Sequence, residues 1–213
     1  MTFLEIQNKV LALMDEEGDT GTVLTNAKTF INSALQNRAL ERKWAFMLSA
    51  ETTLTVASGE ITATLPADFN TMHWVKDSDD RLQRQIPLEQ RFADTLIDWE
   101  NAASREYGDY VIRGTTIHFL AMNPDHTGTD YTIQYYFFPD ELVDDDDEPE
   151  FPVQFHDLLV WDSIIGLRGY HGELENLEYL LEQQRRAEHR LYVSNFGADS
   201  VGHSPKQVRY IPV

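Results

Sequence analysis

Residues 153–168 constrain the fold of this chain more than any other segment, because they are apolar almost all round. An α-helix that is hydrophobic on every side is normally buried on most sides by other parts of the protein. The rest of the chain must therefore supply partners that cover this helix. The apolar positions are Phe155, Leu158, Leu159, Val160, Trp161, Ile164, Ile165 and Leu167.

A second C-terminal helix is expected directly after this buried one. Gly169-Tyr-His-Gly172 should end the first helix, and residues 173–192 then show the spacing of an amphipathic helix. Three arginines, Arg185, Arg186 and Arg190, lie near its expected end, where positive charge complements the helix dipole.

The N-terminal residues predict a matching pair of helices. Apolar residues recur at helical spacing over residues 2–16 and 23–45, which are separated by a short glycine-containing loop. Two helices joined by so short a loop should pack antiparallel. The second closes on Trp44 and Phe46, and packing of these rings and of Trp161 should join the N-terminal pair to the C-terminal pair.

Between the helical segments the sequence changes to the two-residue alternation of strands. Threonines alternate with apolar residues on both sides of Ser58-Gly59, which predicts a hairpin. Tyr135-Tyr-Phe-Phe138 puts large side chains on both faces of one strand, which fits a sheet interior or a subunit interface. The expected strands are 51–56, 61–64, 71–76, 81–86, two within 110–121, and 130–138, with a short helix over 88–98.

These elements together predict an α+β fold. Residues 1–50 and 151–192 should form a helical bundle, and residues 51–139 a β-rich domain inserted between its two halves. Residues 140–150 form an acidic loop that leads back into the bundle. Residues 193–213 contain few apolar groups until the last positions, so we expect an extended C-terminal tail.

The net charge of −19 is the strongest deviation in composition. A chain this acidic should not bind a nucleic-acid backbone tightly, because such binding needs a basic surface. An acidic wall could instead repel phosphate and let a DNA duplex slide past, or the charge could serve solubility alone.

The acidic loop has three interpretations. It could be a solvated linker, a carboxylate ring that edges a DNA passage, or a site for divalent cations between neighbouring subunits. Like charges at this density repel, so we expect an extended or mobile segment. The candidate channel-facing residues are Asp144, Asp145, Asp146, Asp147 and Glu148.

No motif of the chain carries chemistry, and no catalytic, cofactor-binding or metal-binding residue is assigned. Phosphate-binding loops, serine nucleophile elbows and metalloprotease histidine pairs are missing. The run that starts at Asp15 departs from a calcium loop at Thr20 and Asn26. Each histidine, including His156 at the start of the buried helix, is expected to be neutral and satisfied or exposed. A catalytic carboxylate pair has no assignable position among 36 acidic residues.

The chain shows no sign of membrane insertion or export. No apolar run approaches the roughly 20 residues that a membrane span needs. The N-terminus lacks the basic-then-apolar pattern of a signal peptide. Cysteine is absent, so no disulfide framework or thiolate metal site is expected.

Five short features, in order along the chain, carry a resemblance to a known family. They are Phe30-Ile-Asn-Ser-Ala-Leu35, Trp44-Ala-Phe46, Leu65-Pro-Ala-Asp-Phe69, the segment from Tyr135-Tyr136 to Pro139, and the segment from Phe151-Pro152 to Phe155-His156. Over roughly residues 3–192 the chain resembles the head–tail adaptor, or connector, family of tailed bacteriophages. That resemblance implies a helical bundle with an inserted β-rich domain and no catalytic residues.

The resemblance also implies an assembly and partners. Such adaptors form rings, typically of twelve copies, that dock on the portal protein at the neck of the virion. They join head to tail, meet further tail or nozzle proteins, and let double-stranded DNA pass without sequence-specific binding. Before assembly the protein would reside in the host cytoplasm. The C-terminal segment would reach toward the portal, and its tip mixes residue types enriched at interfaces. The candidate portal-binding residues are Phe196, Lys206, Arg209, Tyr210 and Ile211.

Two other functions remain open from the residues alone. The first is a tail-associated hydrolase that acts on cell-envelope polymers, which an essential carboxylate with a raised pKa would mark. The second is an acidic DNA mimic that inhibits a nucleic-acid enzyme. A mimic would spread its carboxylates at phosphate-like spacing, whereas many carboxylates of this chain cluster in one loop.

Overall fold

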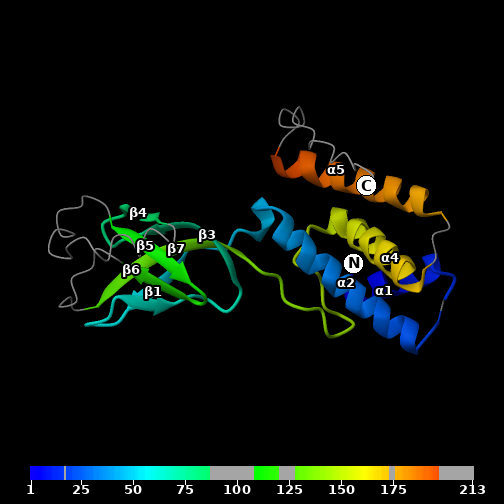
Figure 1. Cartoon of the computed structure of the whole chain (residues 1–213), viewed down its shortest axis with the longest axis horizontal. Coiled ribbons are helices and arrows are strands. Elements are labelled where there is room, and N and C mark those ends of the chain that lie inside the picture. Colours follow the sequence, from blue (N-terminus) through cyan, green and yellow to red (C-terminus); the bar gives the residue numbers. More distant parts are fainter. Residues whose placement is uncertain (17, 87–107, 120–127, 173–175, 197–213) are drawn as a thin grey trace, which may run out of the picture. The chain divides into compact units, whose positions relative to one another are not determined.

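The computed structural model describes the chain except for residues 17, 87–107, 120–127, 173–175 and 197–213 (Figure 1). The chain divides into two compact units. The helical unit contains Met1–Phe46 and the described residues from Pro139 onward, and the strand unit contains Met47–Phe138. The predicted α+β fold is confirmed, because N- and C-terminal helices pack together and a sheet is inserted between them in the sequence.

Helix α4 lies at the centre of the helical unit and contacts each of the other three described α-helices. Its Leu158, Leu159 and Leu167 are fully buried, as the apolar sequence predicts. The helix ends at Gly172, whose φ of 73° suits glycine. The helices are α1 (Phe3–Leu13), α2 (Thr22–Glu41), α4 (His156–His171) and α5 (Leu177–Phe196), with short 3-10 turns η1 (Ala45–Met47) and η3 (Val153–Phe155).

Helix α5 ends four residues later than the sequence predicts. It continues to Phe196, so residues 193–196 are helical and do not belong to an extended tail. Its last turn consequently contains no basic residue. The three arginines expected at the helix end lie in its middle, where they do not complement the dipole.

The strand unit holds a seven-stranded sheet in the order β1-β7-β3-β4-β5-β6-β2. Neighbouring strands are antiparallel except β4 and β5, which are parallel. The sheet curls into a near-barrel around a core that includes Val75, Ile117 and Ile133, each fully buried. The strands are β1 (Thr52–Val56), β2 (Thr62–Thr64), β3 (Phe69–Lys76), β4 (Leu82–Gln85), β5 (Asp109–Arg113), β6 (Thr116–Phe119) and β7 (Thr129–Phe137).

The hairpin predicted at Ser58-Gly59 is wrong, whereas two other pairs of expected strands do form hairpins. Strands β3 and β4 pair across the turn that contains Asp80, and β5 and β6 pair across Gly114. The chain does turn at Gly59, but β1 pairs with β7 and β2 pairs with β6, at opposite edges of the sheet. The alternation of polar and apolar residues predicts that a segment is a strand, but it does not predict which strand lies beside it. Here the pairing of β1 with β7 and of β2 with β6 follows from the way the sheet curls. The predicted helix over 88–98 lies outside the described residues.

Candidate interaction surfaces

The acidic loop of residues 140–150 is attached to the start of helix α1 through its backbone. The N–H of Phe3 donates to the carbonyl of Asp147 at 2.7 Å, and the N–H of Leu4 donates to the carbonyl of Asp145 at 3.0 Å. The first N–H groups of a helix have no partner within the helix, so these bonds satisfy two of them.

Helix α2 holds the same loop from a second direction. The side-chain oxygen of Asn32 accepts from the N–H of Leu142 at 2.9 Å, and its amide nitrogen donates to the Leu142 carbonyl at 3.0 Å. The Leu142 side chain is buried, and Lys28 Nζ lies 3.5 Å from Asp145 Oδ1. The loop contains no helix or strand, and these contacts hold its backbone against α1 and α2. The prediction of an extended or mobile segment considered only the carboxylates, whereas the backbone makes most of these contacts.

One carboxylate of the loop is hydrogen-bonded to the loop's own backbone, whereas several others face solvent. Asp147 Oδ2 accepts from the N–H groups of Val143 at 2.6 Å and Asp144 at 2.8 Å, and these bonds lower the pKa of Asp147. Asp144, Asp145, Asp146 and Glu148 are exposed. Within the described part of the chain, Asp144 and Asp146 make no ion pair, so the loop presents unneutralised negative charge on a defined backbone.

An aromatic cluster joins the N- and C-terminal halves of the helical unit, as the sequence predicts. Trp44 is buried and donates from Nε1 to the carbonyl of Arg38 at 2.7 Å. Its ring stacks on Phe46 at 5.9 Å between centroids, and Phe46 meets Phe151 edge-on at 5.0 Å. Trp161, which was expected to join this packing, is only half-buried.

Phe196 is the one predicted portal-binding residue that the structure describes. Its ring lies 5.9 Å from that of Trp44 and 4.9 Å from that of Tyr192, yet 42% of the residue remains exposed. The neighbouring Asn195 Oδ1 accepts from the N–H of Ala45 at 2.8 Å. Phe196 therefore belongs to the helical unit. The other predicted portal-binding residues, Lys206, Arg209, Tyr210 and Ile211, lie outside the described residues.

A buried arginine, which the sequence analysis missed, ties α2 to α4 and α5. Arg38 forms a bidentate pair with Asp162, with contacts of 2.7 and 2.8 Å. Glu41 and Glu188 lie 2.8 and 3.3 Å from the same guanidinium. Burial lowers the pKa of Arg38, but the hydrogen bond and charge of Asp162 outweigh it, so the pKa is raised. Gln184 of α5 completes the network with a 2.7 Å bond to Asp162.

His156 is a hydrogen-bonded residue of the core. It is 2% exposed, its Nε2 lies 2.6 Å from the carbonyl of Phe151, and its Nδ1 lies 2.9 Å from the amino group of Met1. Burial lowers its pKa, which favours the neutral ring. This matches the expectation of a satisfied, neutral histidine.

Two of the features that carry the family resemblance meet in the strand unit. The hydroxyl of Tyr135 donates to Asp68 Oδ1 at 2.9 Å, and the N–H of Phe138 donates to the carbonyl of Asp68 at 2.6 Å. The ring of Phe69 lies 5.6 Å from that of Tyr135. The segment Leu65–Phe69, which leads from β2 into β3, is thus packed against the end of β7 and supports the sheet.

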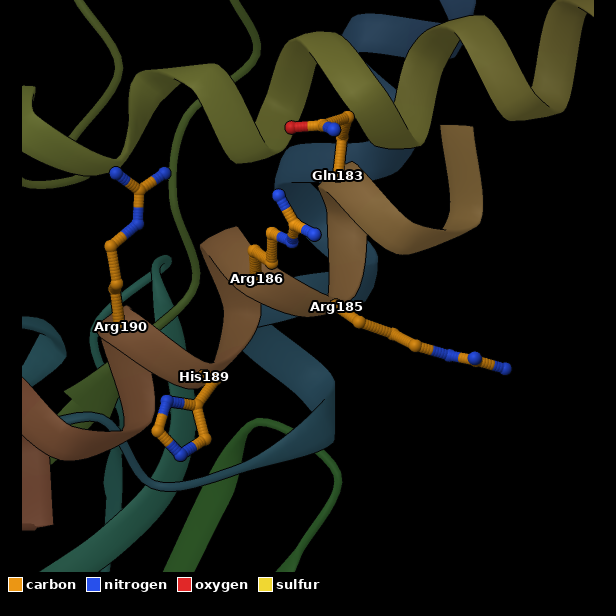
Figure 2. A pocket seen from close by; sticks show the side chains of 5 residues that line it. All are labelled: Gln183, Arg185, Arg186, His189 and Arg190. Atoms are coloured by element: carbon orange, nitrogen blue, oxygen red, sulfur yellow. The ribbon is translucent and has the colours of Figure 1, made fainter. Parts of the chain in front are cut away.

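Positive charge gathers on the outward face of helix α5. Side chains of this helix line a shallow hollow of about 530 Å³. In Figure 2, Gln183, Arg186 and Arg190 project to one side of α5, whereas Arg185 and His189 project in other directions. We call this surface the arginine face. Its members are Gln183, Arg185, Arg186, His189 and Arg190.

Among the described residues, no group of three or more histidine or acidic side chains is arranged to hold a metal ion. No helix in that part of the chain is long and apolar enough to cross a membrane.

The helical bundle with an inserted near-barrel sheet is the architecture that the family resemblance implies. A comparison with protein families matches residues 1–187 to the family described as SU10 adaptor protein, and the chain belongs to this family of phage adaptor proteins. The match confirms the resemblance and favours a structural role over the hydrolase alternative. It implies a location in the virion and binding to other virion proteins. No curated protein matches the sequence.

Proposed function

We propose that this protein assembles as a ring, of about twelve copies, beneath the portal of a tailed phage. The ring joins head to tail and contacts further tail or nozzle proteins, and double-stranded DNA passes through its centre. The observation that carries the proposal is the match of residues 1–187 to an adaptor family. Rings of identical subunits also suit a small protein that must surround a duplex.

The acidic loop is the part of the helical unit best suited to face the passing DNA. Asp144, Asp145, Asp146 and Glu148 are exposed on a backbone that α1 and α2 hold in place. Carboxylates repel phosphate, so such a surface would guide a duplex without slowing it. Asp147 differs from its neighbours because its carboxylate is used inside the loop.

The C-terminal residues are the proposed contact with the portal. The sequence from Val208 to Val213 mixes aromatic, aliphatic and arginine side chains, which are residue types common at interfaces. On a portal ring many such tails would bind at once, so weak single contacts would add to a stable assembly.

The first experiment measures the mass of the protein alone and after mixing with portal particles, followed by particle imaging. A closed ring on the portal is the expected result. Protein that does not bind the portal particles would overturn the proposal.

A truncation tests the tail separately. The cut belongs after Phe196, because Asn195 and Phe196 pack within the helical unit. We expect the chain without residues 197–213 to stay folded and to lose portal binding. A variant in which Gly/Ser residues replace 197–213 at equal length separates tail sequence from tail length. Full binding by that variant would reject the tail as the contact.

A further inference from the structure

The arginine face of α5 concentrates positive charge in a chain that is otherwise strongly acidic. Three of the 17 basic residues, Arg185, Arg186 and Arg190, lie within six positions, with His189 between them. All four side chains are exposed, and the residues that α5 buries are Leu180, Ala187 and Leu191. The charge is therefore not needed for packing of the helix.

Most of this charge has no counterpart within the same copy. Arg186 Nε pairs with Glu182 at 2.9 Å, and both side chains are largely exposed. Over the residues that the structure describes, Arg185 and Arg190 make neither an ion pair nor a hydrogen bond. By contrast, Glu188 of the same helix points inward to Arg38. Two guanidinium groups are thus available to a partner.

We propose that the arginine face binds Asp144 and Asp146 of the acidic loop, residues 140–150, of a second copy of this chain, which leaves the exposed Asp145 and Glu148 of that loop to face the DNA. The inference rests on the ring proposed above, whose neighbouring subunits it would join head to tail. A contact between two different surfaces of one chain is the kind that generates a ring.

The two surfaces lie on different sides of the helical unit, as such a contact requires. The acidic loop binds α1 and α2, whereas α5 packs on α4. In Figure 1 the loop passes beyond α2, and α5 lies on the far side of α4. Each copy therefore offers one surface to each of its two neighbours.

The chemistry of the two surfaces is complementary. Asp144 and Asp146 are exposed and unpaired within the described chain, and Arg185 and Arg190 have the matching sign. Arginine binds carboxylate through two parallel hydrogen bonds, which gives a defined geometry. The loop is already ordered by Asn32 and by the start of α1, so binding would cost little ordering. A DNA partner fits less well, because the net charge of −19 repels phosphate.

A charge exchange tests the contact. The variants are R185E/R190E on the face and D144R/D146R on the loop, studied as full chains by sedimentation over a concentration series. Each variant alone would set like charges against each other and should weaken self-association about tenfold. An equal mixture of the two should recover it, because every face then meets a loop of opposite charge. The matched control R81E/R113E changes the net charge of the chain as much as R185E/R190E but lies in the strand unit.

Cross-linking detects the same contact even where association is weak. The chain has no cysteine, so H189C and D146C each introduce a single thiol. A mixture of these two variants with a short bis-maleimide should give a cross-linked dimer, whereas R113C mixed with D146C should not. The R185E/R190E change added to H189C should reduce the product about tenfold.

The outcomes separate this contact from the ring itself. A charge-dependent cross-link without a ring on the portal would reject the proposed function and retain the contact. A ring without the cross-link, or self-association unchanged in R185E/R190E, would overturn the contact. DNA binding that R185E/R190E removes while the cross-link persists unchanged would also overturn it and assign the face to nucleic acid.

Discussion

The two units of this protein bury titratable groups of opposite character. The helical unit encloses a charged guanidinium, Arg38, which the carboxylate of Asp162 holds in place. The core of the strand unit encloses three neutral phenols, Tyr110, Tyr131 and Tyr135. The helical unit therefore depends on a charge being present and paired. The strand unit also pairs a buried carboxylate, Asp109, with the exposed Arg84, but it depends in addition on three groups staying uncharged.

Strong base should break the strand unit first, and this is the largest effect we expect. Desolvation by burial raises the pKa of each of these tyrosines from 10 to about 12, with smaller contributions from Asp77 on Tyr131 and from Asp68 on Tyr135. A raised pKa stabilises the folded state fully below pH 10, and that contribution is lost as the pH rises through 12. Each pKa unit corresponds to about 1.4 kcal/mol, and three groups act together.

Two spectroscopic signals separate the units in this titration. Tyrosinate absorbance should rise cooperatively between about pH 10 and 12, while the helical circular-dichroism signal persists. The variant Y110F/Y131F should move the transition to higher pH. A gradual rise in absorbance that is the same in the variant would contradict the expectation that these buried phenols control the strand unit.

Removal of the buried arginine should break the helical unit. Arg38→Met leaves Asp162 without its bidentate partner, and loss of one member of a buried pair costs about 3–5 kcal/mol. Urea unfolding followed by helical circular dichroism measures the loss. The matched control Arg81→Met removes a pair whose two side chains are 61% and 65% exposed, and should cost less than about 1 kcal/mol. Equal losses in the two variants would show that Arg38 is no more important than a surface residue.

A second substitution identifies the cause of that loss. Arg38→Met combined with Asp162→Asn removes the unpaired charge as well as the arginine. Part of the lost stability should return, because a neutral amide costs less to bury than a lone carboxylate. No recovery would mean that the packing of the Arg38 stem, rather than charge, holds the helices together.

The comparison between units also shows what the sequence could predict. The buried helix α4 follows from its apolar residues alone, and the strands follow from alternation. The burial of Arg38 could have been predicted from the sequence, because Arg38 lies on the same face of α2 as the buried Ala27, Ile31 and Ala34. An arginine on such a face needs a buried acid, but the sequence does not reveal that Asp162 supplies it.

The missed features all depend on contacts between distant residues. The last turn of α5 contains Ser194 and Asn195, which favour a loop by local preference. The contacts of Asn195 with Ala45 and of Phe196 with Trp44 keep it helical. The acidic loop was expected to be extended or mobile because its composition shows charge, whereas its position is held by backbone groups that composition does not describe.

The smallest effect should come from two glycines of α4 that differ only in their surroundings. A Cβ at Gly166 would lie 2.6 Å from the ring of Phe30, whereas a Cβ at Gly169 would meet no atom within 4 Å. Both substitutions to alanine gain up to about 1 kcal/mol of helix propensity. Gly169→Ala should therefore raise the stability of the helical unit, measured by thermal unfolding.

Gly166→Ala should lower stability by about 1 kcal/mol, because an overpacked contact costs more than the propensity gain returns. The ring of Phe30 also packs against Tyr170 at 6.1 Å, which limits how far it can move. Adding Phe30→Leu to Gly166→Ala should recover part of the loss. Equal gains from both glycine substitutions would mean that Phe30 yields freely, so that α2 and α4 are packed less tightly than the buried Arg38 pair implies.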